Sequence, residues 1–226
     1  MVAMADELAR RGAFRRGGAH NRADRQSWQL TEANCRKLIA AAGIAWAAGT
    51  PFNRFVTLAF GKSGIDVRDC VAATGDWIKL ARDWFASQAL PMPWAWVQEW
   101  GSVNLAHCHI LFHVPPALAP LFKGRSKVWA AKVIAKHDGC YTKGTTECQK
   151  IRCSDRPALY PDAYRAALAF KVHYMLKCAP AELESRLGMT GRGPKPWGQS
   201  CPVYGKRLAV WQGWEKCSDE GRDWLD

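Results

Sequence analysis

The fold of this protein is decided by the stretch PWAWVQEWGSVNLAHCHILFHV, residues 93–114. Residues 93–100 and 105–114 are rich in aromatic and β-branched side chains, which favour strands. Between them lies GSVN, residues 101–104, a sequence of small and polar residues typical of a turn. Two strands joined by so short a turn predict an antiparallel hairpin.

Histidines are concentrated in the second strand of this predicted hairpin. The chain contains six histidines, and three of them fall within seven residues. Because side chains alternate between the two faces of a strand, His107, His109, Leu111 and His113 share one face, and the opposite face is apolar. Imidazoles two residues apart lie roughly 7 Å apart along a strand, so both can reach one ion. They are either buried core histidines or metal ligands.

Glu99 favours the metal interpretation. It lies in the first strand of the hairpin, eight residues before His107, and the turn brings the two strands together. One carboxylate and two imidazoles form a mixed oxygen and nitrogen site, which suits Mg²⁺ or Mn²⁺ acting on phosphate oxygens. One alternative stays open: Glu99 is a solvated strand carboxylate.

The remaining pattern predicts one α+β domain with a central, mainly antiparallel sheet and flanking helices. After an initial helix the order is β-α-β-β-α-β-α, with no internal repeat. Thr31 is placed to cap the first helix, and Pro180 to stop the last one. The expected helices are 31–48, 66–89, a helical region at 115–136, and 161–178; the expected strands are 54–60, 93–100, 105–114 and 147–153.

The last predicted helix carries a candidate nucleophile. Tyr174 and Lys177 are three residues apart on one helical face, and Lys171 lies three residues before Tyr174. Nearby ammonium groups favour the phenolate form of a tyrosine and neutralise a phosphate that it attacks. The alternative is an amphipathic helix with a half-buried tyrosine and lysines that extend to solvent.

Composition points to a polyanionic partner. The net charge is +12, and twelve tryptophans accompany the basic residues, a combination suited to single-stranded nucleic acid. No apolar run is long enough for a membrane span, and the start lacks a secretory apolar core, so we expect no membrane association. Nine scattered cysteines without a CxxC pair indicate reduced thiols in a cytoplasmic compartment.

Taken in order, three short motifs resemble those of the HUH endonuclease superfamily, and most closely the rolling-circle replication initiators. FVTL (residues 55–58) resembles the first motif, His107-Cys108-His109 matches the second, and Tyr174-Met175-Leu176-Lys177 matches the third. Glu99 matches the frequent third metal ligand of the family. Some members use three histidines, so His113 could replace Glu99 as the third ligand, or it could lie behind the ligands and support them. The resemblance spans about residues 54–178, and the FVTL match is the loosest of the three.

The resemblance implies a fold, a reaction and partners. The fold would be ferredoxin-like, as in RRM domains, and Glu99, His107 and His109 would hold Mn²⁺ or Mg²⁺. Tyr174 would attack a single-stranded DNA origin, often a hairpin, to leave a 5′-phosphotyrosine link and a free 3′-OH that primes replication. Lys177 would assist, with Thr57 and Lys171 contacting the DNA. Host helicase and polymerase, in a bacterial cytoplasm, would complete replication.

Composition and the resemblance together divide the chain into three parts. Residues 28–188 would form the HUH endonuclease domain. Residues 1–27 would be a mobile basic arm, and residues 189–226 a basic, tryptophan-rich extension. Transposases and relaxases built on the same site are alternatives, as is a non-catalytic module that binds single-stranded nucleic acid through structural histidines.

Overall fold

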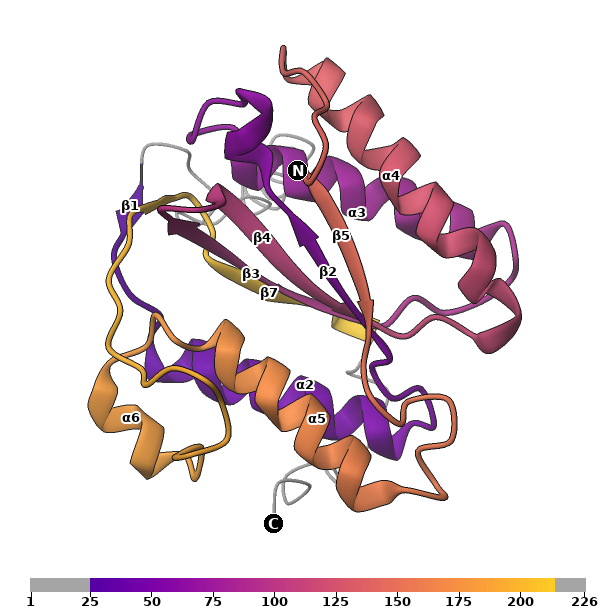
Figure 1. Cartoon of the computed structure of the whole chain (residues 1–226), viewed down its shortest axis with the longest axis vertical. Helices are drawn as coiled ribbons and strands as arrows, with labels where there is room; N and C mark the ends of the chain where they lie inside the picture. Colours follow the sequence, from indigo (N-terminus) through magenta and orange to yellow (C-terminus); the bar gives the residue numbers. More distant parts are fainter. Residues whose placement is uncertain (1–24, 214–226) are drawn as a thin grey trace, which may run out of the picture.

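A five-stranded antiparallel sheet forms the centre of the molecule (Figure 1). The computed structural model describes residues 25–213. The strand order in the sheet is β5-β2-β4-β3-β7, and every neighbouring pair is antiparallel. The strands are β2 (Arg54–Leu58), β3 (Trp94–Gly101), β4 (Leu105–Phe112), β5 (Thr146–Lys150) and β7 (Leu208–Val210).

Helices cover both faces of this sheet. In Figure 1, α3 and α4 lie on one face, whereas α2 and α5 lie on the other, with α6 beside them. The α-helices are α2 (Glu32–Ala47), α3 (Cys70–Ala86), α4 (Ala119–Lys136), α5 (Pro161–Met175) and α6 (Ala181–Arg186). Short 3-10 turns, η2 (Phe60–Ser63) and η3 (Pro116–Leu118), and a two-stranded ribbon of β1 (Gln26–Ser27) and β6 (Val203–Tyr204) complete the described chain.

The topology is that of a ferredoxin-like domain with additions. The segment from β2 to β5 runs β-α-β-β-α-β, and its four strands pair in the order last, first, third, second. This arrangement confirms the predicted α+β class and antiparallel sheet. Helices α2 and α5 are additional to that unit, and they close the sheet face that would otherwise be open.

The predicted hairpin is confirmed with its register. Strands β3 and β4 pair so that Glu99 faces His107 and Val97 faces His109 across the ladder. The alternation also holds, because Leu111 packs in the core beneath α2 and α5 whereas Ile110 packs beneath α3 and α4. Both faces of β4 are therefore buried, and its histidines are enclosed by protein rather than exposed on a surface.

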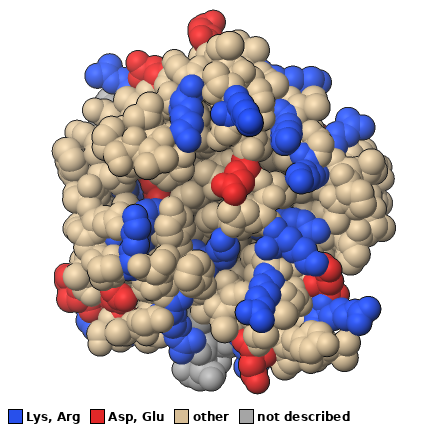
Figure 2. Space-filling view, in the orientation of Figure 1, with Lys and Arg blue, Asp and Glu red and all other residues tan. Residues whose placement is uncertain are grey.

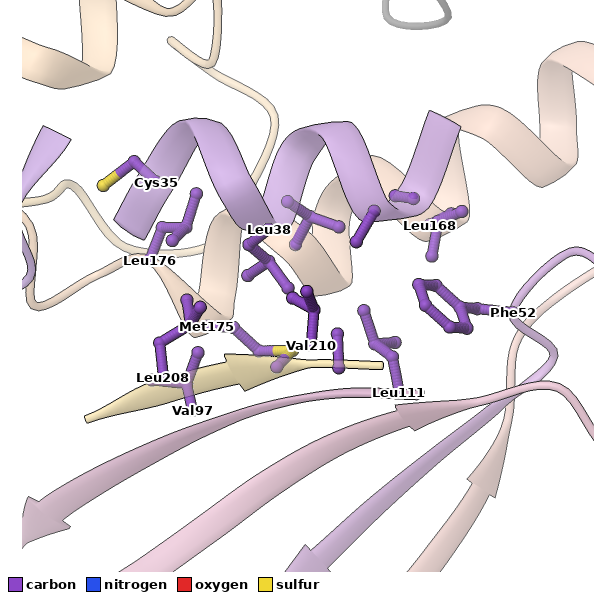
Figure 3. Packing of buried hydrophobic residues seen from close by; sticks show 14 of the residues in the cluster. Cys35, Leu38, Phe52, Val97, Leu111, Leu168, Met175, Leu176, Leu208 and Val210 are labelled. Carbon is purple, nitrogen blue, oxygen red and sulfur yellow. The ribbon is translucent and has the colours of Figure 1, made fainter. Parts of the chain in front are cut away.

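The core beneath α2 and α5 is apolar and closely packed (Figure 3). Leu38 of α2, Leu168 of α5 and Leu111 of β4 are fully buried in this cluster. Thr31 caps α2 as predicted, because its side-chain oxygen accepts a hydrogen bond from the Asn34 N–H at 3.2 Å. This core positions the carboxyl end of α5 near the carboxyl end of β3 and the amino end of β4.

Several element boundaries differ from the sequence prediction: α3 is shorter at both ends, and β2, β4 and β5 end two or three residues earlier than expected. Two further differences bear on the site. Helix α5 ends at Met175 rather than at 178, because the backbone of Leu176 leaves the helical region. In addition, residues 208–210 form β7 and pair with β3, so the segment predicted as an extension contributes an edge strand to the central sheet. A strand of three residues is too short to show a period-two pattern, which is why the sequence did not indicate it.

The predicted division into an arm, a domain and an extension stays a prediction. Most of the arm, residues 1–24, lies outside the described residues, as do residues 214–226. Gln26 and Ser27, at the end of the proposed arm, pair with Tyr204 and Val203. No helix within residues 25–213 has both the length and the apolar composition needed to cross a membrane.

Tyr164 provides a test of the packing beneath α5. Its side chain is fully buried, and its hydroxyl donates a hydrogen bond to the Phe52 carbonyl at 2.7 Å. Replacing Tyr164 by Phe removes this buried hydrogen bond, which we expect to lower the free energy of unfolding by about 0.5–1.5 kcal/mol in urea titrations. Tyr160→Phe, at an exposed side chain, is the control, and equal stabilities for the two variants would contradict this assignment.

Candidate metal centre

Glu99, His107 and His109 converge at one end of the β3–β4 hairpin. One ligand atom from each residue lies within 4.8 Å of the others, and all three residues are buried, with exposed fractions of 1%, 5% and 2%. The group combines one carboxylate with two imidazoles. Within residues 25–213, it is the one cluster of His, Cys, Asp and Glu with the geometry of a metal site.

His107 presents its outer ring nitrogen to the centre. Its Nδ1 lies 2.7 Å from the carbonyl oxygen of Leu105, which can only accept, so Nδ1 carries the hydrogen. In the neutral ring, Nε2 then carries the lone pair, and it lies 3.3 Å from Glu99 Oε2. A lone pair and a carboxylate oxygen that face each other at this distance favour a proton or a cation between them.

His109 is held in the same way from the neighbouring strand. Its Nδ1 hydrogen-bonds with Thr57 Oγ1 at 3.0 Å, and its ring stacks on Phe55 with centroids 5.1 Å apart. Burial lowers the pKa of His109 to about 4, although the Glu99 charge opposes this shift. The imidazole is therefore neutral near pH 7, which is the form that binds a metal.

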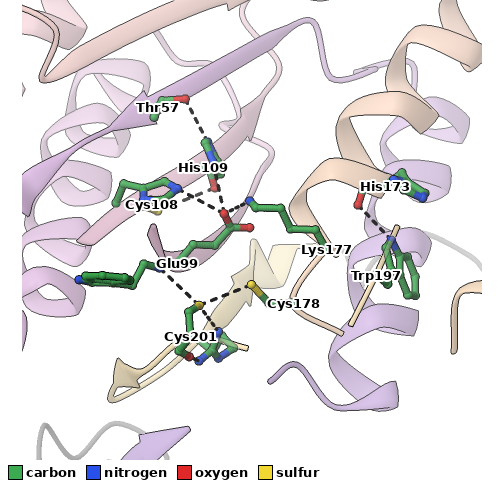
Figure 4. Close-up of polar contacts among 12 residues, drawn as sticks. Thr57, Glu99, Cys108, His109, His173, Lys177, Cys178, Trp197 and Cys201 are labelled. Carbon is green, nitrogen blue, oxygen red and sulfur yellow. Dashed lines mark hydrogen bonds and ion pairs between the residues drawn. The ribbon is translucent and has the colours of Figure 1, made fainter. Parts of the chain in front are cut away.

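Glu99 supplies the negative charge. Burial acts to raise its pKa, but His109, His107 and the Lys177 ammonium together outweigh burial and hold the pKa well below its usual range. Glu99 Oε2 accepts a hydrogen bond from Lys177 Nζ (Figure 4). The carboxylate is therefore ionised inside the protein, and its charge is matched by one ammonium group.

Two buried atoms of the group lack a hydrogen-bond partner: Glu99 Oε1 and His109 Nε2. Buried polar atoms are usually paired, so unpaired ones at a single point indicate a missing ligand. A carboxylate oxygen and neutral imidazole nitrogens are the donors that divalent cations such as Mn²⁺ and Zn²⁺ accept in proteins. The residues present therefore fit a divalent cation.

Tyr174 lies beside this group. Its ring centroid is 5.1 Å from that of His109, and Lys177 Nζ lies 4.0 Å above the tyrosine ring. The side chain is half-buried. Lys177 follows the end of α5 instead of lying on the helix as predicted, but the turn still brings it next to Tyr174 because its N–H bonds the Tyr174 carbonyl at 3.4 Å.

The other predicted site residues are not members of the group formed by Glu99, His107 and His109. His113 lies beyond the end of β4, and its Nδ1 donates a hydrogen bond to the Pro51 carbonyl at 2.8 Å. It is not a member of the three-residue group. Lys171 Nζ donates to Gln149 Oε1 at 2.7 Å and lies 4.6 Å above the Phe55 ring. Thr57 is buried and bonds His109, as described above.

Two further clusters near the centre were missed by sequence reasoning (Figure 4). Behind Lys177, the sulfur atoms of Cys178 and Cys201 lie 3.5 Å apart. On the opposite side of α5, the buried His173 pairs with Glu184 at 2.9 Å. Partners this far apart in sequence share no local spacing, so no motif could have indicated them.

We expect Thr57 to orient the His109 ring. Thr57→Val removes the hydroxyl that bonds Nδ1, and losing such a partner typically lowers metal affinity about 10–100-fold. Calorimetric titration of the protein with Mn²⁺ measures this change. Thr57→Ser keeps the hydroxyl and should retain most of the affinity; identical affinity in the wild type and in the valine variant would contradict this role.

Comparison with known proteins adds one distant similarity. No protein-family model and no curated protein matches the chain. Among solved structures, the chain is similar to the N-terminal nuclease domain of non-structural protein 1 from minute virus of mice, with a TM-score of 0.28 and 14% sequence identity. That structure is described as showing a Zn²⁺ in its active-site pocket and DNA recognition at the origin of replication. The match covers 62% of this chain and 52%, about half, of the other chain.

Proposed function

We propose that the protein is a metal-dependent endonuclease that nicks and rejoins single-stranded DNA through a phosphotyrosine intermediate. The observation that carries this proposal is the position of Tyr174. A half-buried tyrosine ring lies 5.1 Å from a histidine of a buried Glu-His-His group, with an ammonium 4.0 Å from the same ring. The proposed nucleophile, the proposed stabilising cation and the proposed metal ligands therefore lie within one small region.

The reaction is a transesterification at phosphorus. The Tyr174 oxygen attacks the scissile phosphate, forming a tyrosyl–phosphate bond as the bond from phosphorus to the 3′ oxygen breaks. The proton lost by the Tyr174 hydroxyl is balanced by the proton that the leaving 3′ oxygen takes up. A divalent cation held by Glu99, His107 and His109 would polarise a phosphate oxygen. The freed 3′-OH can attack the phosphotyrosine in the reverse direction and rejoin the strand, so the bond energy is conserved.

Lys177 serves two groups at once. Its ammonium contacts the Glu99 carboxylate and lies over the Tyr174 ring. A cation in this position would stabilise the negative charge that develops on the phosphate. Lys177 is therefore proposed as a catalytic residue, whereas Thr57 is proposed to position His109 in addition to its predicted contact with DNA.

The surface is suited to a nucleic-acid substrate. The chain carries a net charge of +12, and Figure 2 shows Lys and Arg side chains distributed across the visible face with fewer acidic ones. Trp100, the residue after Glu99, is 43% exposed, and Trp28 is 55% exposed. Cations that contact phosphates and exposed aromatic rings that stack on bases are the two requirements for binding single strands.

The biological setting that we propose is initiation of rolling-circle replication at a hairpin origin, with host helicase and polymerase. It rests on the resemblance of the three motifs to replication initiators. Transposition or plasmid mobilisation would use the same chemistry on a different DNA. Cleavage of candidate origin, transposon-end and transfer-origin hairpins separates these settings.

A second candidate function is a binding module without catalysis. The contact between Lys177 and Glu99 favours it, because an ammonium already neutralises the buried carboxylate. In that case the histidines are structural, and a metal is not required for binding DNA.

Cleavage distinguishes the two candidate functions. We expect the protein, given Mn²⁺ and a labelled single-stranded hairpin, to form a covalent protein–DNA adduct on a denaturing gel. Tyr174→Phe should abolish the adduct because it removes the attacking oxygen, whereas Tyr160→Phe, at the exposed start of α5, should leave it unchanged. An adduct that persists in Tyr174→Phe would exclude Tyr174 as the nucleophile.

Metal binding tests the ligands separately. His107→Ala and His109→Ala should each lower Mn²⁺ affinity at least about tenfold and slow cleavage in parallel, because each removes a direct ligand. His113→Ala is the matched control, since that ring bonds Pro51 outside the group. If DNA binding persists, no substrate is cleaved and Mn²⁺ affinity is the same in all variants, the binding-module function is correct.

A further inference from the structure

A pair of buried sulfur atoms lies next to the candidate metal centre. Cys178 and Cys201 are 2% and 4% exposed, and their Sγ atoms are 3.5 Å apart (Figure 4). Cys178 follows Lys177 in the chain. Cys201 Sγ accepts a hydrogen bond from the N–H of Trp100, the residue after Glu99, at 3.4 Å. The proposed nuclease reaction uses neither sulfur.

Arg207 indicates that one of the two sulfurs carries a negative charge. Its guanidinium, in a residue only 4% exposed, donates from Nη1 to Cys201 Sγ at 3.4 Å and from Nε to Ser27 Oγ at 3.1 Å. Across residues 25–213, no carboxylate forms an ion pair with Arg207. A guanidinium stays protonated in proteins, and a buried charge needs a counter-charge. Arg207 Nη2 also donates to the carbonyls of Ser27 and Cys201, so the Cys201 sulfur is the one among these acceptors that can ionise and supply the counter-charge.

The other contacts of Cys201 agree with a thiolate. The thiol of Cys178 donates to it, and together with Arg207 and the Trp100 N–H it outweighs burial and holds the pKa of Cys201 well below its usual range. The same contact and burial raise the pKa of Cys178. By contrast, burial raises the pKa of Cys35 and of Cys70 to about 12, so those thiols stay protonated and unreactive.

Two backbone hydrogen bonds hold the chain segments of the pair next to each other. The N–H of Gln199 bonds the Lys177 carbonyl at 3.0 Å, and the N–H of Gly198 bonds the Ala179 carbonyl at 2.8 Å. The two chain segments therefore run side by side next to the sulfurs. Bringing the sulfurs from 3.5 Å to a bond length of about 2.05 Å requires a small movement of side chains.

We propose that Cys178 and Cys201 form a reversible oxidation site, which hydrogen peroxide converts into a disulfide. The Cys201 thiolate attacks one peroxide oxygen; the O–O bond breaks, giving a sulfenic acid and hydroxide. The Cys178 sulfur then attacks the sulfenic sulfur, the S–O bond breaks, and the hydroxyl leaves with the Cys178 proton as water. Two thiols are oxidised and one peroxide is reduced, and a dithiol reductant reverses the change.

The pair is less suited to binding a soft metal ion than to oxidation. The pair offers two sulfurs, and the Arg207 guanidinium donates to one of them, so a cation would meet an existing positive charge. Oxidation, in contrast, needs a thiolate beside a thiol. The link would join the turn that carries Lys177 to the segment that leads into β6, and it is independent of the proposed nuclease function.

Mass spectrometry of the reduced full chain tests the site. After brief treatment with equimolar hydrogen peroxide and blocking of the remaining thiols, we expect loss of two hydrogens and one cross-linked peptide pair that contains Cys178 and Cys201. Dithiothreitol should restore both thiols. Oxidation at Cys201 should be at least about tenfold faster than at Cys35 or Cys70, because thiolates are the reactive form.

Two variants test the roles of the individual cysteines in this oxidation. Cys178→Ser should leave Cys201 as a sulfenic acid that dimedone traps, and Cys70→Ser should still form the disulfide. The proposal is overturned if both cysteines remain fully alkylatable after peroxide treatment of the wild type. It is also overturned if Cys201 reacts no faster than Cys35, or if the cross-link joins other cysteines.

Discussion

The ionised carboxylate of Glu99, buried within the sheet, is the constraint on which the site depends. A carboxylate that is 1% exposed is costly unless several donors surround it. Here the donor is the Lys177 ammonium after α5, and the rings of His107 and His109 on β4 face the same carboxylate oxygen. Neutralising this one charge therefore connects the hairpin to the end of a helix that is distant in sequence.

The position of the site follows from the alternation along β4. On one face of this strand, Leu111 packs in the apolar core, and His109 and His107 follow at steps of two residues. This face of β4 changes from apolar at Leu111 to polar at His109. His109 lies beside Tyr174, near the carboxyl end of α5. The apolar part of the face fixes the strand, and the polar end is held in a defined position as a result.

Local pattern predicted the parts of the fold that depend on neighbours in sequence. Alternation and a four-residue turn sufficed for the hairpin, and with it for the proximity of Glu99 to His107. The proximity of Tyr174 to His109 could not be deduced in this way, because no local signal says which face of the sheet α5 covers; only the family resemblance implied it. Its ring contact shows the two residues close together.

The errors have physical causes as well. The run before Pro180 contains good helix formers through Lys177, so its sequence does not show that the helix ends at Met175. Strand β7 has three residues and no readable period. The contacts of Arg207 with Ser27 and Cys201 join segments from both ends of the described chain, and they could be found only in three dimensions.

Backbone hydrogen bonds from distant segments also hold the turn that carries Lys177. Lys177 lies in a turn outside the helix, where backbone alone would leave it free to move. Leu30 donates its N–H to the Cys178 carbonyl at 2.9 Å, and Gln199 donates to the Lys177 carbonyl at 3.0 Å. Segments before the first helix and after the last helix therefore hold the turn from both sides. A chain truncated after residue 188 would keep every proposed metal ligand and Tyr174. It would lose the hydrogen bond from Gln199 that helps to hold Lys177 against Glu99.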